Sequence, residues 1–417
     1  MGCSKNLVDS EHLMHILQEK GYQLSPEGED LTAGKVDEVV INTCGFINDA
    51  KVESINAILE AVEAKKAGLI KKVSVFGCLS QRYRDELIAE IPEVDEWQGT
   101  MTFDTLDRVL TTPSHYAYLK ISEGCDRSCS YCAIPMIRGP HKSVPMESVI
   151  AEARMLAARG VKELIVIAQD TTFYGVDLYG KRTLALLLDK LSEIEGIEWI
   201  RVHYSYPASF PDDVLSTISS NPKICKYIDI PLQHSETAVL SAMRRGVDAD
   251  QTRRLVEKMR DRIPGVTLRT TLMVGHPGEG EKEFEGLLDF VREYEFERLG
   301  AFTYSEEEGT WGADHLKDSV PEDVKQARYD SLMELQSSIS EACNVRRIGR
   351  RERVLVDSYS DGVLVARSQS ESPEVDGEIL IGDGKSLSGC NPESLVGKFV
   401  DVSIKSAGEY DLLAEII

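Results

Sequence analysis

Short apolar runs alternate with longer segments of helical period from residue 36 onward. Residues 36–43 and 73–76 have the apolar character of strands, and residues 47–67 between them have the spacing of an amphipathic helix. Strands that alternate with helices build a mostly parallel sheet whose faces are covered by the helices. The alternation therefore predicts an α/β fold that begins with a small doubly wound domain in residues 1–110.

A second series of strands and helices follows a polar linker at residues 111–114. Its strand-like runs occupy residues 117–121, 163–168, 198–203, 226–230, 266–273 and 298–303. Six units of this kind suit a partial (β/α)6-type barrel, in which active sites lie at the carboxyl ends of the strands. We therefore expect a central barrel over residues 115–342.

The last part of the chain, residues 350–417, has a different pattern. Short strand-like runs such as residues 354–356 and 400–404 alternate with Gly, Asp and Ser turns, and no helical stretch is evident. This pattern is typical of a small antiparallel β-barrel. The sequence thus predicts a third, all-β domain.

Charge and cysteine content narrow the class of protein. The chain has 47 basic and 70 acidic side chains, and its net charge of −23 opposes non-specific attraction to nucleic acid. Its aliphatic runs are far shorter than the ~18 apolar residues of a membrane span, and its start lacks an apolar signal segment. Asn6 stands where a myristoylation site needs Ser or Thr. We therefore expect a cytoplasmic protein whose nine cysteines are metal ligands, catalytic groups or buried thiols rather than disulfides.

Three cysteines, Cys125, Cys129 and Cys132, form a CxxxCxxC cluster in a loop that follows the first predicted barrel strand. The loop lies at the carboxyl end of that strand, the active face of a barrel. A structural zinc ion would need a fourth ligand, for which His141 is the nearest candidate. A cubane iron–sulfur cluster held by only three thiolates would instead leave one iron open for a ligand. Three unconnected core cysteines are the remaining alternative.

A second set of cysteines, Cys3, Cys44 and Cys78, is dispersed in the sequence. Cys44 and Cys78 each follow a predicted strand of the N-terminal domain. Neighbouring strands lie ~4.8 Å apart, so thiols that leave the same carboxyl edge of a sheet can meet where such sheets bind ligands. A second metal site is one interpretation, and buried small apolar thiols are the other.

The CxxxCxxC cluster with Tyr131 before its last cysteine is similar to the signature of radical S-adenosylmethionine (SAM) enzymes. Residues 2–6, 42–46 and 77–82 resemble the N-terminal module of the methylthiotransferases within that superfamily, and the C-terminal barrel is similar to a TRAM domain. Family members usually have a strand before the first cysteine, whereas here only Met1 and Gly2 precede it.

The resemblance implies two [4Fe-4S] clusters and SAM as cofactors. The cluster at Cys125, Cys129 and Cys132 would bind SAM and generate a 5′-deoxyadenosyl radical, so that the difficult chemistry belongs to the cofactor. The cluster at Cys3, Cys44 and Cys78 would carry the sulfur to be inserted. A low-potential electron donor such as flavodoxin or ferredoxin is implied as a partner.

Two branches of this family differ in substrate. One modifies an adenosine of tRNA, and the other modifies the β-carbon of an aspartate in small-ribosomal-subunit protein twelve. Gly-Cys-Ser-Lys-Asn at residues 2–6, together with residues 122–125 and 167–172, resembles the ribosomal-protein branch. Residues 350–417 hold 7 basic and 13 acidic side chains, which favours a basic protein partner and argues against direct RNA binding. The alternatives are the tRNA enzyme and, from another class, a non-catalytic iron–sulfur or zinc scaffold on the ribosome.

Polar residues at the predicted carboxyl ends of barrel strands are candidates for binding SAM. They are Gln169, Asp170, Ser205, Gln233 and His234, together with Tyr131 in the cysteine loop and Arg269 inside a strand. Each also has a simpler interpretation: the loops could only be turns, His234 could cap a helix, and Arg269 could be an outward charge.

The single basic block of the chain, residues 346–353, precedes the predicted C-terminal barrel. A solvated helix end followed by a linker is the favoured interpretation, and contact with RNA is the alternative. Cys225, Cys343 and Cys390 have no partner pattern, so we interpret them as structural.

Overall fold

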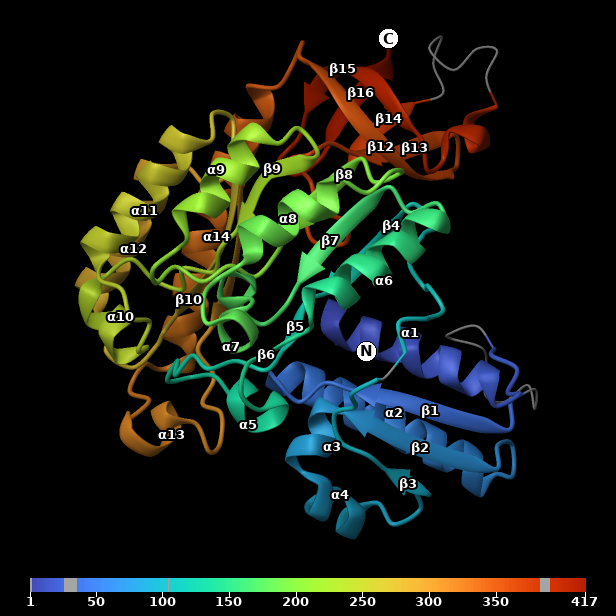
Figure 1. Cartoon of the computed structure of the whole chain (residues 1–417). Helices are drawn as coiled ribbons and strands as arrows, with labels where there is room; N and C mark the ends of the chain where they lie inside the picture. The colour runs from blue at the N-terminus through green and yellow to red at the C-terminus, as the bar shows by residue number, and fades with distance from the viewer. Residues whose placement is uncertain (1, 26–35, 104, 383–390) are drawn as a thin grey trace.

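The computed structural model describes residues 2–25, 36–103, 105–382 and 391–417 of the protein. Three β-systems follow one another along the molecule: a small parallel sheet, a six-stranded parallel sheet and a closed barrel (Figure 1). The predicted α/β fold class is therefore confirmed. Cys390, interpreted as structural, lies outside the described residues. None of the described helices is both long enough and apolar enough to cross a membrane.

The N-terminal sheet is parallel and has the strand order β1-β2-β3. Its elements are β1 (Glu38–Thr43), α2 (Asn48–Lys66), β2 (Lys72–Gly77), α3 (Cys78–Arg82), α4 (Arg84–Glu90) and β3 (Glu96–Trp97). Ile58, Ala61 and Val62 recur at helical spacing on α2 and bury one face of the helix against Val73 and Val75 of β2. The register pairs Thr43 with Gly77, so β1 and β2 end side by side.

Helix α1 (Ser4–Glu19) precedes this sheet and packs on a different part of the molecule. Its Val8 joins a buried cluster with Tyr118 of β4 and Ile165 of β7, on the inner face of the central sheet. A buried ion pair of 2.9 Å between Glu11 and Arg108 also anchors the helix. Figure 1 accordingly shows α1 between the central and the N-terminal sheets. The start of the chain thus belongs to the seam between them.

The central sheet is an open, six-stranded parallel sheet with the order β11-β10-β9-β8-β7-β4. Its strands are β4 (Tyr116–Lys120), β7 (Glu163–Ile167), β8 (Trp199–Val202), β9 (Ile224–Asp229), β10 (Thr267–Val274) and β11 (Arg298–Thr303). The helices that cover it are α6 (Met146–Ala158), α8 (Leu184–Ser192), α9 (Asp212–Ser220), α11 (Ala249–Arg262), α12 (Glu281–Tyr294) and α14 (Glu322–Val345). Every residue of β7 is buried, as expected for a parallel strand covered on both faces.

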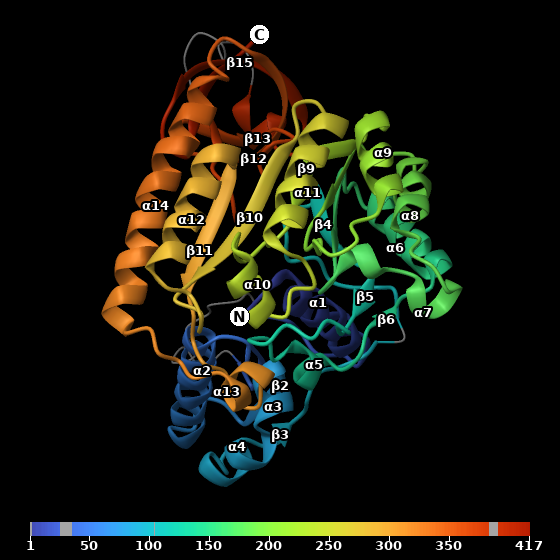
Figure 2. The ribbon, with the colours of Figure 1, turned by 90° about the vertical axis from the view of Figure 1, so that its left-hand side faces the viewer.

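Shorter helices and strands lie at the carboxyl ends of these strands. They are β5 (Ser122–Glu123), α5 (Ile134–Arg138), β6 (Lys142–Ser143), η2 (Thr171–Phe173), α7 (Val176–Tyr179), α10 (Thr237–Ala242) and α13 (Trp311–His315). Helix α5 contacts α3 of the N-terminal sheet, and Figure 2 shows both helices with α13 below the central sheet. The carboxyl ends of the two parallel sheets therefore meet in this region.

The C-terminal strands form a closed barrel with the order β12-β13-β14-β16-β15. They are β12 (Arg351–Ser360), β13 (Val363–Arg367), β14 (Ile379–Gly382), β15 (Phe399–Ala407) and β16 (Leu412–Ile416), with a short turn η4 (Pro392–Leu395). The predicted barrel is present, but β14 and β16 pair in parallel. A closed ring with an odd number of strands cannot alternate in direction throughout, so one parallel pair is required.

Candidate active site

The loop that carries the CxxxCxxC cluster begins at Gly124, directly after β5. Gly124 has φ of +74°, and a Cβ there would collide with the carbonyl oxygen of Pro140. Only glycine fits such a turn without strain. The backbone N–H of Cys125 then donates to the carbonyl of Gly139 at 3.1 Å. The loop is thereby closed at its base, and its cysteines are held at the carboxyl end of the barrel strands.

The thiols of this loop share a half-buried environment. Burial raises the pKa of Cys125 to about 11 and that of Cys132 to about 12, and interaction with neighbouring thiols of the same loop adds to both increases. Arg245 Nη1 donates to Cys129 Sγ at 3.3 Å, and the Tyr206 hydroxyl lies 3.6 Å from the same sulfur. The structure therefore brings the three predicted ligands together, with a guanidinium beside them.

The geometry does not support a zinc site completed by His141. His141 Nε2 lies 3.0 Å from Ser143 Oγ, and among the described residues no three His, Cys, Asp or Glu side chains are placed to hold one metal ion. In a cubane cluster each thiolate binds a different iron, so the three sulfurs need not converge on a point. The donor set of three thiols in one loop fits such a cluster.

The second set of cysteines gathers at the carboxyl edge of the N-terminal sheet. Cys44 follows β1 and Cys78 follows β2, at the adjacent ends fixed by the register. A Cβ on Gly2 would lie 3.2 Å from Cys44 Cβ, so the segment with Cys3 lies beside Cys44. Cys44 and Cys78 are buried and Cys3 is exposed. Segments from three parts of the sequence thus place their thiols in one neighbourhood.

Arg138, at the end of α5, connects the two sets of cysteines. Its Nε donates to Cys78 Sγ at 3.2 Å, and its Nη1 donates to Asp9 at 2.8 Å and Glu123 at 2.9 Å. Its Nη2 donates to Asn6. The side chain of Arg138 is 2% exposed. Burial alone would lower the pKa of its guanidinium, but the carboxylates of Asp9 and Glu123 outweigh burial and raise it. One fixed cation therefore joins the CxxxCxxC loop, α1 and the edge that carries Cys78.

Several predicted SAM-binding residues border the CxxxCxxC loop. Gln169 Nε2 donates to Glu123 at 2.5 Å, whereas the Oε1 atoms of Gln169 and Gln233 are buried without a partner in the described part of the chain. Buried acceptors of this kind are normally satisfied, so they fit a hydrogen-bonding ligand such as SAM. The hydroxyl oxygen of Tyr131 accepts a hydrogen bond from Arg245 Nη1 at 3.3 Å. Ser205 is buried, and its backbone N–H donates to the carbonyl of Asp229 at 2.9 Å.

Three other predicted residues have strong internal partners. Asp170 accepts from Arg127 Nε at 2.8 Å and so anchors the CxxxCxxC loop. His234 is completely buried; its Nδ1 accepts from a backbone N–H and its Nε2 lies 3.1 Å from Glu279. Arg269 faces the barrel interior and pairs with Asp229 at 3.0 Å. The binding of cofactor by these three side chains stays a prediction.

Three residues of the site were missed by sequence reasoning: Arg127, Arg138 and Arg245. The guanidinium groups of Arg127 and Arg245 lie 4.2 and 4.4 Å from the centre of the Tyr206 ring. Arg127 lies within the CxxxCxxC loop and Arg138 lies six positions after its last cysteine, so their positions in the sequence could have indicated a place in the site. Arg245 is distant in sequence, and nothing local marks it, whereas Tyr206 directly follows the predicted residue Ser205.

Comparison with known proteins assigns each part of the chain. Residues 119–291 match the radical SAM superfamily, residues 1–99 match the uncharacterized protein family UPF0004, and residues 348–417 match the TRAM domain. The ribosomal protein uS12 methylthiotransferase RimO of Bacteroides thetaiotaomicron is 49% identical over 431 residues, covering 100% of this chain and 97% of the relative. RimO of Porphyromonas gingivalis is 50% identical, covering 100% and 98%. This chain belongs to the RimO methylthiotransferase family.

Membership of the RimO family makes the protein an enzyme, a transferase, whose family cofactors are SAM and [4Fe-4S] clusters. A solved radical SAM methyltransferase, TsrM from Kitasatospora setae, has the same fold over 72% of each chain, with a TM-score of 0.53 and 13% identity. The predicted family and cofactors are thus confirmed. The assignment of individual residues to each cluster rests on the geometry described above.

Proposed function

We propose that this RimO-family enzyme inserts a methylthio group at the β-carbon of an aspartate in ribosomal protein uS12. The observation that carries the proposal is Arg138, which contacts Cys78 of one cysteine set and Glu123, two positions before Cys125 of the other, within a chain similar over its full length to RimO enzymes. Radical generation and sulfur delivery need two adjacent sites, and the carboxyl ends of the two sheets provide them.

Cys125, Cys129 and Cys132 would hold the cluster that binds SAM, and Cys3, Cys44 and Cys78 would hold the second cluster. When bound, SAM and the clusters supply a carbon-centred radical and the sulfur.

The protein contributes position and charge to this chemistry. Burial raises the pKa of Cys125, and the backbone N–H and the positive charge of Arg127 partly offset that rise. Arg245 Nη1 donates to Cys129 Sγ at 3.3 Å. Both guanidinium groups lie within cation–π distance of the Tyr206 ring. The unpaired Oε1 atoms of Gln169 and Gln233 would accept hydrogen bonds from SAM.

The choice of a protein substrate is supported by charge. The C-terminal domain has 13 acidic and 7 basic side chains, and the whole chain is at −23. A basic ribosomal protein is attracted to such a surface, whereas RNA phosphates are repelled. We further propose that the enzyme acts in the cytoplasm and receives electrons from flavodoxin or ferredoxin.

A side-by-side assay tests the substrate. The anaerobically reconstituted enzyme is incubated with SAM, reductant and sulfide, and with either uS12 or an anticodon stem-loop carrying isopentenyl adenosine. We expect uS12 alone to gain the ~46 Da of a methylthio group, detected by mass spectrometry. Modification of the stem-loop alone would refute the protein substrate and leave the radical chemistry in place.

A further inference from the structure

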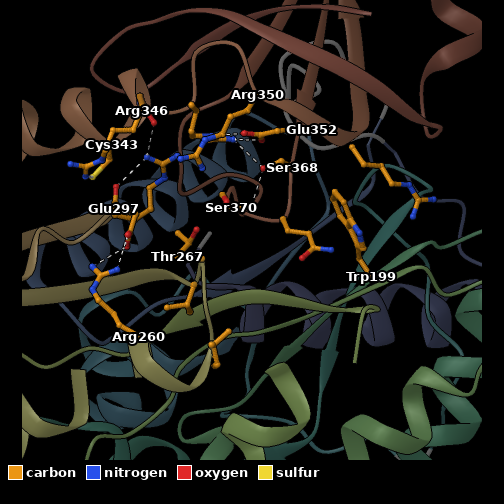
Figure 3. A pocket seen from close by; sticks show the side chains of 18 residues that line it. Trp199, Arg260, Thr267, Glu297, Cys343, Arg346, Arg350, Glu352, Ser368 and Ser370 are labelled. Carbon is orange, nitrogen blue, oxygen red and sulfur yellow. Dashed lines mark hydrogen bonds and ion pairs between the residues drawn. The ribbon is translucent and has the colours of Figure 1, made fainter. Parts of the chain in front are cut away.

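A cavity away from the two candidate cluster sites lies at the amino-terminal edge of the central sheet. It has a volume of about 530 Å³ and is enclosed by the starts of β10, β11 and β12, the end of α14, and the loop after β13. Figure 3 shows side chains from the central sheet and from the C-terminal domain facing one another across it. The cavity is therefore a pocket in the seam between the two domains.

The lining of this pocket is rich in arginine, in contrast to the acidic chain around it. It contains six arginines and two glutamates: Arg260, Arg298, Arg346, Arg347, Arg350, Arg353, Glu297 and Glu352. Four of these arginines belong to the basic block at residues 346–353, which the proposed function does not use. The structure thus folds that block around a cavity.

Ion pairs fix part of this lining in place. Arg347 binds Glu352 through two contacts of 2.7 and 3.0 Å and also pairs with the buried Glu371. Arg298 pairs with the same Glu371 at 2.9 Å, and Arg260 pairs with Glu297 at 2.8 Å. Guanidinium groups held this way lose little conformational entropy when a ligand binds. The pocket wall is therefore preorganised.

Several donors in the pocket remain unused. The side chain of Arg350 is exposed and makes no hydrogen bond or ion pair with any residue that the structure describes. Arg298 is 7% exposed, and its Nε is buried without a partner. The hydroxyls of Thr267 and Ser370 also line the pocket without a hydrogen bond to a described residue. Buried donors are normally satisfied, so Arg298 Nε lacks an expected acceptor, and the exposed Arg350 guanidinium is free to contact a ligand.

We propose that this pocket binds a small phosphate-bearing anion. Guanidinium groups recognise phosphate through paired, charge-assisted hydrogen bonds, and hydroxyls complete the set of donors. The volume lies in the range of small-molecule sites and exceeds the needs of a single phosphate, which favours a diphosphate or a nucleotide.

The anion is a small molecule rather than RNA, because a net charge of −23 repels a polyanion over long distances. A small anion inside the pocket responds mainly to charges within the Debye length of ~8 Å. Arg350 precedes β12 and Arg298 begins β11, so one ligand would contact both domains. Its binding would stabilise the docking of the C-terminal barrel on the central sheet.

Calorimetric titration of pyrophosphate into the full chain, in a buffer without phosphate, tests the proposal. We expect saturable binding, accompanied by a rise in the melting temperature because the ligand binds only the folded state. Arg350→Ala should weaken the affinity about tenfold or more, since it removes a charged donor without disturbing the core. Arg84→Ala removes an equal charge from an exposed helix elsewhere and should leave the affinity unchanged.

Three results would overturn the proposal. They are the absence of saturable binding, an equal loss of affinity in the two variants, and displacement of pyrophosphate by an RNA oligonucleotide that binds more tightly. The last result would assign the pocket to an RNA backbone instead. The test does not involve the cysteines, so its outcome is independent of the methylthiotransferase assignment.

Discussion

Arg138 Nε lies 3.2 Å from Cys78 Sγ, although the two residues are 60 positions apart in the chain. The same guanidinium is held by Asp9 and Glu123 and follows the CxxxCxxC loop by one short helix. One guanidinium therefore contacts both a thiol of the N-terminal set and the carboxylate that directly precedes the CxxxCxxC loop.

The first prediction concerns Arg138. A charge-assisted hydrogen bond to a ligand sulfur favours the reduced, more negative state of an iron–sulfur cluster. Arg138→Gln should therefore lower the reduction potential of the N-terminal cluster by on the order of 50 mV, and Arg138→Lys should lower it less. Potentiometric titration followed by electron paramagnetic resonance measures both potentials in one sample. An unchanged N-terminal potential in Arg138→Gln, with both clusters present, would refute the role of this residue.

The second prediction concerns the CxxxCxxC loop. Replacing Cys125, Cys129 and Cys132 together by Ala should leave about half of the bound iron and abolish SAM cleavage, since one of two clusters loses its ligands. Iron and sulfide analysis and the release of 5′-deoxyadenosine are the measurements. Cys225→Ala is the matched control, because Cys225 is buried in another cluster of side chains. Continued SAM cleavage by the triple variant would contradict the assignment.

The third prediction separates the two tasks of the site. Cys44→Ala should preserve 5′-deoxyadenosine formation but stop the insertion of sulfur, because Cys44 lies at the carboxyl edge of the N-terminal sheet and not in the CxxxCxxC loop. Mass spectrometry of uS12 and chromatography of the nucleoside report the two activities from the same reaction. If a folded Cys44→Ala protein no longer cleaves SAM, the two sets of thiols do not act separately.

The fourth prediction concerns pH. Burial would raise the pKa of Glu123, but Lys120 and Arg138 outweigh it and lower the pKa from 4.5 to about 2. When folding lowers the pKa of a carboxyl group, its ionisation stabilises the fold at pH values above the pKa of the unfolded state. This stabilisation is lost as the pH falls through the pKa of the folded state. The ionisation of Glu123 therefore contributes about 3 kcal/mol at neutral pH, lost between about pH 4.5 and 2.

Urea unfolding at several pH values compares Glu123→Gln with the parent protein. The stability difference between them should shrink as the pH falls from 5 to about 2, the range set by that pKa shift. Glu86→Gln, at an exposed position of α4, is the control and should show no such trend. A difference that stays constant over this range would contradict the ion-pair account.

Much of the architecture could be predicted from the sequence, because strands and helices are indicated by local patterns of apolar residues. Strand β7 is a continuous apolar run, and α2 buries residues at helical spacing, so both were predicted to within about two residues. Cys125, Cys129 and Cys132 lie within eight positions, so their proximity follows from the chain itself. Composition likewise fixed the acidic character of the C-terminal domain.

The tertiary structure alone decided the contacts that connect distant segments. Arg138 reaches Cys78, and Arg245 reaches Cys129, only because separate βα units bring their carboxyl ends to one edge. The contact between His234 Nε2 and Glu279 in the core likewise joins two separate segments, and no local signal indicated it. The periodicity of apolar residues indicates which face of a helix or strand is buried, but it does not indicate which other element covers that face. Partner choice depends on packing across the whole chain, and so the joining of the two cysteine sets and the arginine pocket emerged only from the folded molecule.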